Sequence, residues 1–214
     1  MPTISKKASN GRSRAYHHGH LREAALASAQ AILRHEGVAA LSLRRVAAEV
    51  GVSPMALYNH FENRQALLEA LAEAGFMALG KAILRAAPRG QPPLRRLRRG
   101  AVAYVVFAVE HRYLFELMFG GVNSALARDS PVRSAAAESF STLRDCLADC
   151  ARKKLLSVDP IAAERAIWSA AHGYAALWNS VPALMRGTPQ QIATNAGRML
   201  DALLSGIARP RAPS

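Results

Sequence analysis

Apolar residues recur along most of this chain with helical spacing, and we find no sustained alternation of apolar and polar residues. The clearest stripe places apolar side chains at positions i, i+3, i+4 and i+7, namely Leu43, Val46, Ala47 and Val50. Alanine and leucine dominate the composition, and both favour helices. The pattern therefore predicts an all-α protein.

Helical spacing and its flanking caps or breakers define about nine helices. They cover residues 21–36, 43–50, 54–61, 64–85, 94–112, 114–119, 131–154, 160–180 and 189–207. Three of them begin with a capping residue followed by proline at the first helical position, a typical helix start. We expect the first three to form a small unit and the others a larger helical domain.

Residues 42–61 combine several local signals of two short helices joined by a tight turn. Ser42 precedes the first stripe as an N-cap, and Gly51 follows it where a helix end favours a left-handed residue. Ser53-Pro54 then starts a second helix, which buries Leu57 and Phe61. A break of three residues between the helices is typical of the helix-turn-helix motif.

The second helix leaves a row of short or polar side chains off its buried stripe. Met55 and Ala56 can contact thymine methyl groups, and the amide of Asn59 suits adenine. Tyr58 and His60 can hydrogen-bond phosphates. The alternative is a helical hairpin with a solvated polar face, but caps, glycine, proline and stripe together favour a DNA-binding element.

The stretch Gly37–Leu68 resembles the DNA-binding domain of TetR/AcrR-type bacterial transcriptional regulators. The resemblance lies in Gly37, Ser42-Leu43-Arg44, Val46-Ala47, Gly51-Val52-Ser53, Leu57-Tyr58-x-His60-Phe61 and Leu67-Leu68. Arg64 departs from the family, which usually has lysine there. The resemblance implies an all-helical dimeric regulator with a variable C-terminal ligand-binding domain.

The same resemblance assigns roles to individual side chains. Phosphate contacts would come from Ser42, Tyr58, His60 and Arg64, and groove contacts from Arg44, Pro54, Met55, Ala56 and Asn59. Arg45 and Ser53 complete the candidate DNA-binding set. We expect residues 1–15 to be a flexible basic arm, 16–62 the helix-turn-helix domain, and 63–208 the ligand-binding and dimerisation domain.

The formal net charge of +13 fits a polyanionic partner. Residues 1–64 alone carry nine Lys and Arg against four Glu, and Arg85–Arg99 adds six arginines without an acid. A non-specific nucleic-acid-binding structural protein is therefore the second hypothesis, although packaging would not need the large apolar C-terminal domain. We find no GxSxG, Walker loop, HExxH or dinucleotide-binding turn, so we do not expect an enzyme or a cofactor.

The N-terminal segment and the histidines after it leave alternatives open. The basic arm could contact DNA or be disordered. His17, His18 and His20 could bind a metal, but no cysteine or carboxylate completes a set, and we favour a structural or phosphate-facing role. No stretch approaches the ~20 apolar residues of a membrane span, and no secretory signal precedes the first helix, so we expect a cytoplasmic protein.

The segment WSAAHGYAALW, residues 168–178, is apolar nearly all round, which predicts burial on both sides of its helix. Trp168 and His172 share a face, and Gly173 would let another helix approach closely. The Trp…His-Gly pattern also resembles the WHG-type C-terminal domain of some TetR-like regulators. That resemblance implies a homodimer formed through the last two helices.

His172 is more often a buried histidine bonded to a carbonyl or hydroxyl than a ligand anchor, and both alternatives stay open. If it is an anchor, the candidate pocket comprises Tyr104, Phe107, His111, Phe115, Met118, Phe119, Phe140, Trp168 and His172. Cys146 and Cys150, four residues apart, are expected to be buried small hydrophobes rather than a thiol sensor. No metal site is expected.

These observations together predict a homodimeric repressor. Each subunit would place its second motif helix in the major groove of one half of a pseudo-palindromic operator. A small-molecule effector of unknown identity would release it by shifting the population toward a dimer with mismatched half-site spacing.

Overall fold

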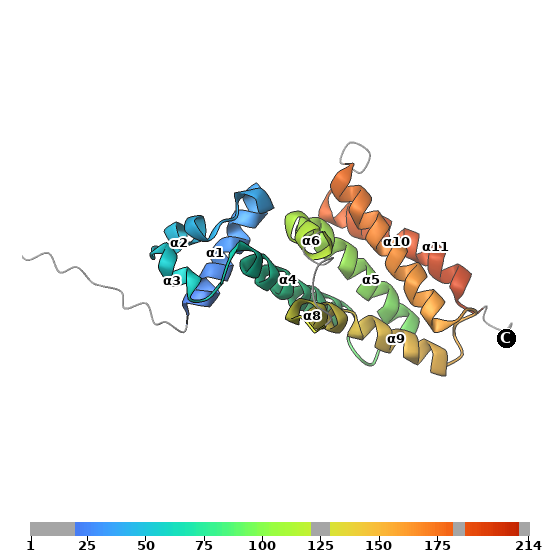
Figure 1. Ribbon diagram of the computed structural model, residues 1–214. Helices are drawn as coiled ribbons and strands as arrows, with labels where there is room; N and C mark the ends of the chain where they lie inside the picture. The colour runs from blue at the N-terminus through green and yellow to red at the C-terminus, as the bar shows by residue number, and fades with distance from the viewer. Residues whose placement is uncertain (1–19, 121–128, 182–186, 210–214) are drawn as a thin grey trace, which may run out of the picture.

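The computed structural model describes residues 20–120, 129–181 and 187–209, and the arm 1–15, His17 and His18 lie outside them. The described residues contain ten α-helices, one 3-10 turn and no β-strand, which confirms the all-α prediction (Figure 1). The elements are α1 (Leu21–Glu36), η1 (Val38–Ala40), α2 (Leu43–Val50), α3 (Pro54–Tyr58), α4 (Arg64–Ala86), α5 (Pro93–Glu110), α6 (Arg112–Phe119), α8 (Pro131–Ser139), α9 (Ser141–Arg152), α10 (Pro160–Ser180) and α11 (Pro189–Ile207).

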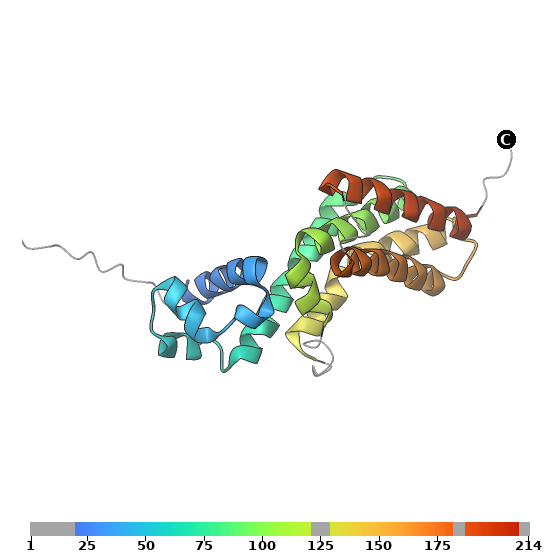
Figure 2. The same cartoon turned by 90° about the horizontal axis from the view of Figure 1, so that it is seen from above.

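Helices α1–α3 form a small unit at one end of the molecule, and α5–α11 form a larger bundle at the other (Figures 1 and 2). Helix α4 runs from the small unit into the bundle. It carries buried side chains along most of its length, from Leu67 near its start to Ile83 near its end. One continuous hydrophobic core therefore joins the two parts.

The local signals around α2 and α3 have the predicted geometry. Ser42 Oγ accepts a hydrogen bond from the Arg45 amide at 3.1 Å, and Ser53 Oγ accepts one from the Ala56 amide at 3.3 Å. Gly51 ends α2 with a φ of 77°, a left-handed conformation that favours glycine.

Helix α3 is shorter than the predicted 54–61, because it ends at Tyr58 and Asn59-His60 form a turn. The amides of both His60 and Phe61 donate to the Leu57 carbonyl at 2.9 Å. The predicted buried face nevertheless forms, since Leu57 and Phe61 both lie in the core.

The predicted single helix over 131–154 is wrong, because α8 and α9 are separated by a bend at Phe140. Ser139 Oγ donates to the Ala136 carbonyl at 2.7 Å just before the bend. The backbone of Ser139 lies so close to α4 that a Cβ on Gly80 would be 3.1 Å from its Cα. The bend lets α8 pack on α4 while α9 packs on α5.

Two buried polar side chains connect the helices of the bundle. Arg96 of α5 is almost completely buried and donates to Asp149 of α9 at 3.0 Å and to the Ala87 carbonyl at 3.4 Å. Asn179 of α10 donates to the Ala108 carbonyl of α5 at 3.1 Å. Both contacts satisfy groups that would be costly to bury unpaired.

None of the helices in the described ranges is long and apolar enough to cross a membrane.

Candidate nucleic-acid interface and ligand cavities

The outer face of α3 presents the side chains for which the sequence predicted base contacts. Met55 is 71% exposed and Tyr58 is 51% exposed, while Pro54 and Asn59 are also exposed. Ala56 is half-buried. Asn59 is the C-cap of α3, and its backbone keeps the helical conformation with a φ of −71° and a ψ of −15°. A five-residue helix with two exposed large side chains offers a surface that can contact a partner.

A surface depression of about 300 Å³ lies beside α3. Its lining consists of Ser42, Leu43, Arg44, Tyr58 and Arg64. The structure thus brings together four of the predicted DNA-binding residues: Ser42 and Arg44 from the start of α2, Tyr58 from the end of α3 and Arg64 from the start of α4. The depression lies at the first turn of α2, where the helix dipole favours an anion.

The neighbouring residues Arg44 and Arg45 have different environments. Arg44 is exposed, whereas the guanidinium of Arg45 donates to both carboxylate oxygens of Glu36 at 2.6 and 2.7 Å. The hydrogen bonds with Arg45 lower the pKa of Glu36, and those with Glu36 raise the pKa of Arg45. This fork-shaped pair ties α1 to α2 and offsets the charge of Arg45.

Arg64 donates to two neutral acceptors, the Leu41 carbonyl at 2.8 Å and the Val38 carbonyl at 2.7 Å. These bonds orient its guanidinium, and because both acceptors are neutral they do not offset its positive charge. The sequence alone missed both this anchoring and the Arg45–Glu36 pair, because each joins residues that only the fold brings close.

His20 Nδ1 lies 3.4 Å from a carboxylate oxygen of Glu23 on the exposed side of α1. Within the described ranges, no three His, Cys, Asp or Glu side chains are grouped so that they could hold a metal ion.

Aromatic rings surround His172 in the larger bundle. Its Nδ1 is hydrogen-bonded to the Tyr104 hydroxyl at 2.7 Å, and the ring centroids of Phe119, Phe115 and Trp168 lie 4.9, 5.1 and 5.5 Å away. Burial lowers the pKa of His172 and raises the pKa of Tyr104. The imidazole is therefore neutral near pH 7, and it has the hydroxyl partner expected of a buried histidine.

The nine predicted pocket residues do not share one cavity. Phe140 and Trp168 line a cavity of about 370 Å³ among α5, α9 and α10. Phe107 and His111 line another of about 210 Å³ where α1 meets α4, α5 and α6. The remaining five belong to the core or pack against it: Tyr104, Phe115, Met118, Phe119 and His172.

Sequence reasoning missed most residues of the two cavities. The larger one is also lined by Leu97, Leu143, Leu147, Ile161 and Ile167, with Arg144, Glu164 and Arg165. Generic apolar residues give no signal of a cavity, because most of them serve as ordinary core.

Cys146 and Cys150 are both buried and free. Burial raises the pKa of both thiols, that of Cys150 to about 11. A reactive cysteine needs a lowered thiol pKa and access to solvent, so these two have the character of small apolar core residues.

Comparisons with known proteins agree with this architecture. Residues 25–71 match the family of bacterial regulatory proteins described as the tetR family, and residues 97–203 match the tetracyclin repressor-like C-terminal domain. The class C tetracycline repressor of Escherichia coli is 49% identical over 53 residues, which are 25% of this chain. The matched stretch spans only 24% of that repressor's length.

Two solved structures are similar over nearly their whole length. A protein of unknown function from Rhodococcus sp. RHA1 is 34% identical, with a TM-score of 0.77, and the match covers 92% of this chain and 100% of that one. The TetR family transcriptional regulator PfmR from Thermus thermophilus has the same fold at 22% identity, with a TM-score of 0.66 and coverage of 88% and 98%.

The first match includes the helix-turn-helix, and the second covers half of the chain in the larger bundle. This chain therefore belongs to the TetR family of bacterial regulatory proteins.

Proposed function

We propose that this protein is a transcriptional repressor that binds a pseudo-palindromic DNA operator as a homodimer and is released by a small-molecule ligand. The observation that carries the proposal is the depression beside α3, where Ser42, Arg44, Tyr58 and Arg64 meet at the first turn of α2. Membership of a family of regulators, and the similarity of the small unit to a tetracycline repressor, support the same function.

In this proposal α3 enters the major groove. Met55 and Ala56 would contact thymine methyl groups, and Asn59, directly after the helix, would pair with an adenine edge. Ser53 and Pro54 would begin the helix close to the bases. Phosphates of the flanking backbone would be held by Ser42, Tyr58, His60 and Arg64. Arg44 lines the same depression, so we assign it a phosphate contact in place of the groove contact that the resemblance implies. Arg45, already paired with Glu36, would mainly brace α2.

We place the dimer contact on α10 and α11. Small residues follow one exposed side of α10, and a Cβ added to Gly173 would meet no other atom within 4 Å. Leu177 on the same side is 56% exposed. A matching helix pair from a second subunit could pack closely there, and Gly173→Arg is expected to shift a dimer to monomer in light scattering.

We place the effector in the larger bundle, where Phe140 and Trp168 line the cavity of about 370 Å³. Its size and apolar walls suit a drug-sized molecule. Such a ligand acts only if it prefers one spacing of the two α3 helices over the other.

The decisive experiment is selection of bound duplexes from a random DNA pool by the purified protein at about physiological salt. An enriched inverted repeat is expected, with strong loss of affinity in Asn59→Ala and unchanged affinity in Ser134→Ala, an exposed control on α8. No enriched motif, together with binding that disappears as salt rises, would instead favour the non-specific nucleic-acid-binding protein.

A further inference from the structure

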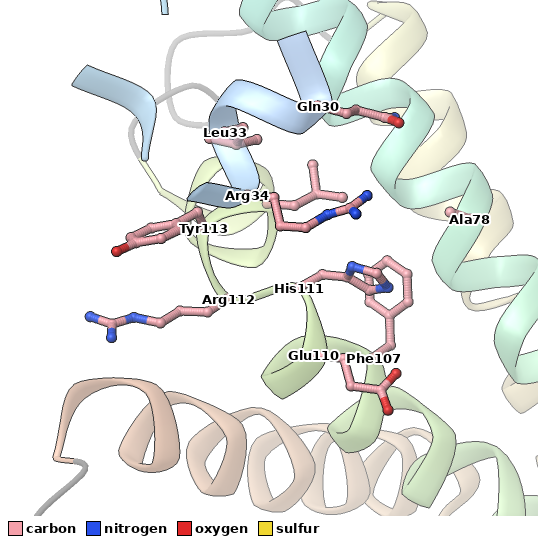
Figure 3. Close-up of a pocket in the computed structure, with 10 residues that line it drawn as sticks. Gln30, Leu33, Arg34, Ala78, Phe107, Glu110, His111, Arg112 and Tyr113 are labelled. Atoms are coloured by element: carbon pink, nitrogen blue, oxygen red, sulfur yellow. The ribbon is translucent and has the colours of Figure 1, made fainter. Parts of the chain in front are cut away.

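The cavity where the small unit meets the larger bundle is built by both (Figure 3). Helix α1 contributes Gln30, Leu33 and Arg34, α4 contributes Ala78, and the junction of α5 and α6 contributes Phe107, Glu110, His111, Arg112, Tyr113 and Leu114. A molecule bound here would touch the DNA-binding unit and the bundle at the same time.

The size and walls of this junction cavity suit one aromatic ring. Its volume of about 210 Å³ exceeds the ~150 Å³ of an apolar cavity that holds benzene. The Phe107 and His111 rings lie 4.5 Å apart between centroids and form one wall, and the buried Leu33 forms another. These walls favour a planar aromatic ring, because such a ring can stack on the side chains of Phe107 and His111 and bury its own apolar surface.

Two exposed side chains of opposite charge, Arg34 and Glu110, lie at the two ends of the wall formed by Phe107 and His111. In Figure 3 the Arg34 guanidinium and the Glu110 carboxylate lie on opposite sides of the Phe107–His111 pair. Neither side chain forms a hydrogen bond or ion pair with another side chain in the described ranges. Both nevertheless act on His111, since burial and Arg34 lower the pKa of its imidazole while Glu110 raises it.

The remaining polar groups of the lining do not compete for such a ligand. Arg112 donates to Glu116 at 3.2 Å, and with Tyr113 it points away from the Phe107–His111 pair (Figure 3). Gln30 extends toward α4 on the same side as Arg34 and could add a neutral hydrogen bond.

We propose that the junction cavity binds a small aromatic carboxylate that carries a hydrogen-bond donor, such as an amino group, opposite the carboxylate. The carboxylate would accept a forked pair of hydrogen bonds from Arg34, and the amino group would donate to Glu110. The ring would lie along the Phe107–His111 wall, with Arg34 at one end and Glu110 at the other.

Such a ligand would connect α1 to α5 and so restrain the small unit relative to the bundle. This regulatory part rests on the proposed DNA-binding function: the ligand changes operator affinity by the same factor by which the operator changes ligand affinity. The binding site itself does not depend on DNA.

The test is titration calorimetry on the full-length protein without DNA, using 4-aminobenzoate, benzoate and aniline as probes. We expect 4-aminobenzoate to bind most tightly. Arg34→Gln should weaken 4-aminobenzoate and benzoate at least about ten-fold and leave aniline unchanged. Glu110→Gln should weaken 4-aminobenzoate and aniline but not benzoate. Arg85→Gln, an exposed control on α4, should behave as wild type.

Three results would overturn the site: no binding of any probe, equal binding by wild type and Arg34→Gln, or loss of binding in Trp168→Ala, which would place the ligand in the larger cavity. If the probes bind as expected but leave operator affinity unchanged, the site stands and the regulatory part is wrong. If the protein does not select an operator at all, the proposed function is wrong while the calorimetry still decides the site.

Discussion

The small unit α1–α3 and the larger bundle α5–α11 differ in how far residues adjacent in the sequence determine the surface that could bind a partner. In the small unit, the Ser42 and Ser53 caps and the turn at Gly51 lie where the sequence pattern predicts them, and the side chains of α3 that face outward belong to one short segment. In the bundle, aromatic residues expected in one pocket are divided between a packed core and two cavities. An exposed face of a short helix is a local property, whereas a cavity requires helices that are distant in sequence to meet.

The largest expected effect comes from truncating one buried core side chain in each of the two regions. Leu57→Ala in α3 should lower the free energy of unfolding by about 2–5 kcal/mol and abolish operator binding, because a fully buried side chain positions α3. Leu147→Ala in α9, also buried and outside the proposed dimer helices, should cost a similar amount but leave operator affinity of the folded protein nearly unchanged. Urea unfolding and DNA titration measure both, and equal loss of DNA binding would contradict the separation.

The next effect distinguishes two adjacent arginines within the small unit. Arg44→Ala should weaken operator binding about ten-fold and reduce the slope of log affinity against log salt by about 1, because it removes one phosphate contact. Arg45→Ala should change the slope little, since Glu36 already pairs with that guanidinium. A slope reduced by about 1 in Arg45→Ala would mean that the pair with Glu36 opens on DNA.

A smaller effect tests the packed aromatic cluster of the bundle by its pH dependence. Burial lowers the pKa of His172 below the ~6.5 of the unfolded chain, so the unfolded state binds the proton first as pH falls. The free energy of unfolding should therefore be fully maintained above about pH 6.5 and should decrease as pH falls below it. His172→Gln should reduce this dependence in urea titrations between pH 7.5 and 5, and the remainder would come from His111, whose pKa burial also lowers.

The control for that titration keeps the histidine but removes its partner. Tyr104→Phe should cost about 1 kcal/mol at every pH because it deletes one hydrogen bond. It should retain the decrease below pH 6.5. Loss of that decrease in Tyr104→Phe would mean that it depends on the hydrogen bond to Tyr104 and not on the burial of His172 alone.

The smallest expected effect is the absence of thiol reactivity in the bundle. Because burial raises the pKa of both cysteines, iodoacetamide at pH 7.5 should label Cys146 and Cys150 far more slowly in the folded protein than in urea. Mass spectrometry of the labelled protein measures both rates. Rapid labelling of the native protein would instead support the alternative that the two cysteines act as a thiol sensor.

Sequence alone determined the all-α fold, the caps and turn of the helix-turn-helix, and the α3 segment that faces outward. Hydrophobic spacing, Ser42, Gly51 and Ser53-Pro54 act within one or two helical turns, so their geometry follows from neighbouring residues. The early end of α3 and the bend between α8 and α9 escaped the pattern. At the bend, periodicity continues through Phe140 while packing against Gly80 redirects the chain.

Only the tertiary structure decided which polar groups meet. Arg45 finds Glu36, Arg64 finds two backbone carbonyls, and Tyr104 finds His172 across 68 positions of sequence. The two cavities likewise exist because helix packing leaves gaps between side chains from different helices. Hydrophobic spacing specifies which face of a helix is buried, but it does not specify which helix covers that face or where the packing is incomplete.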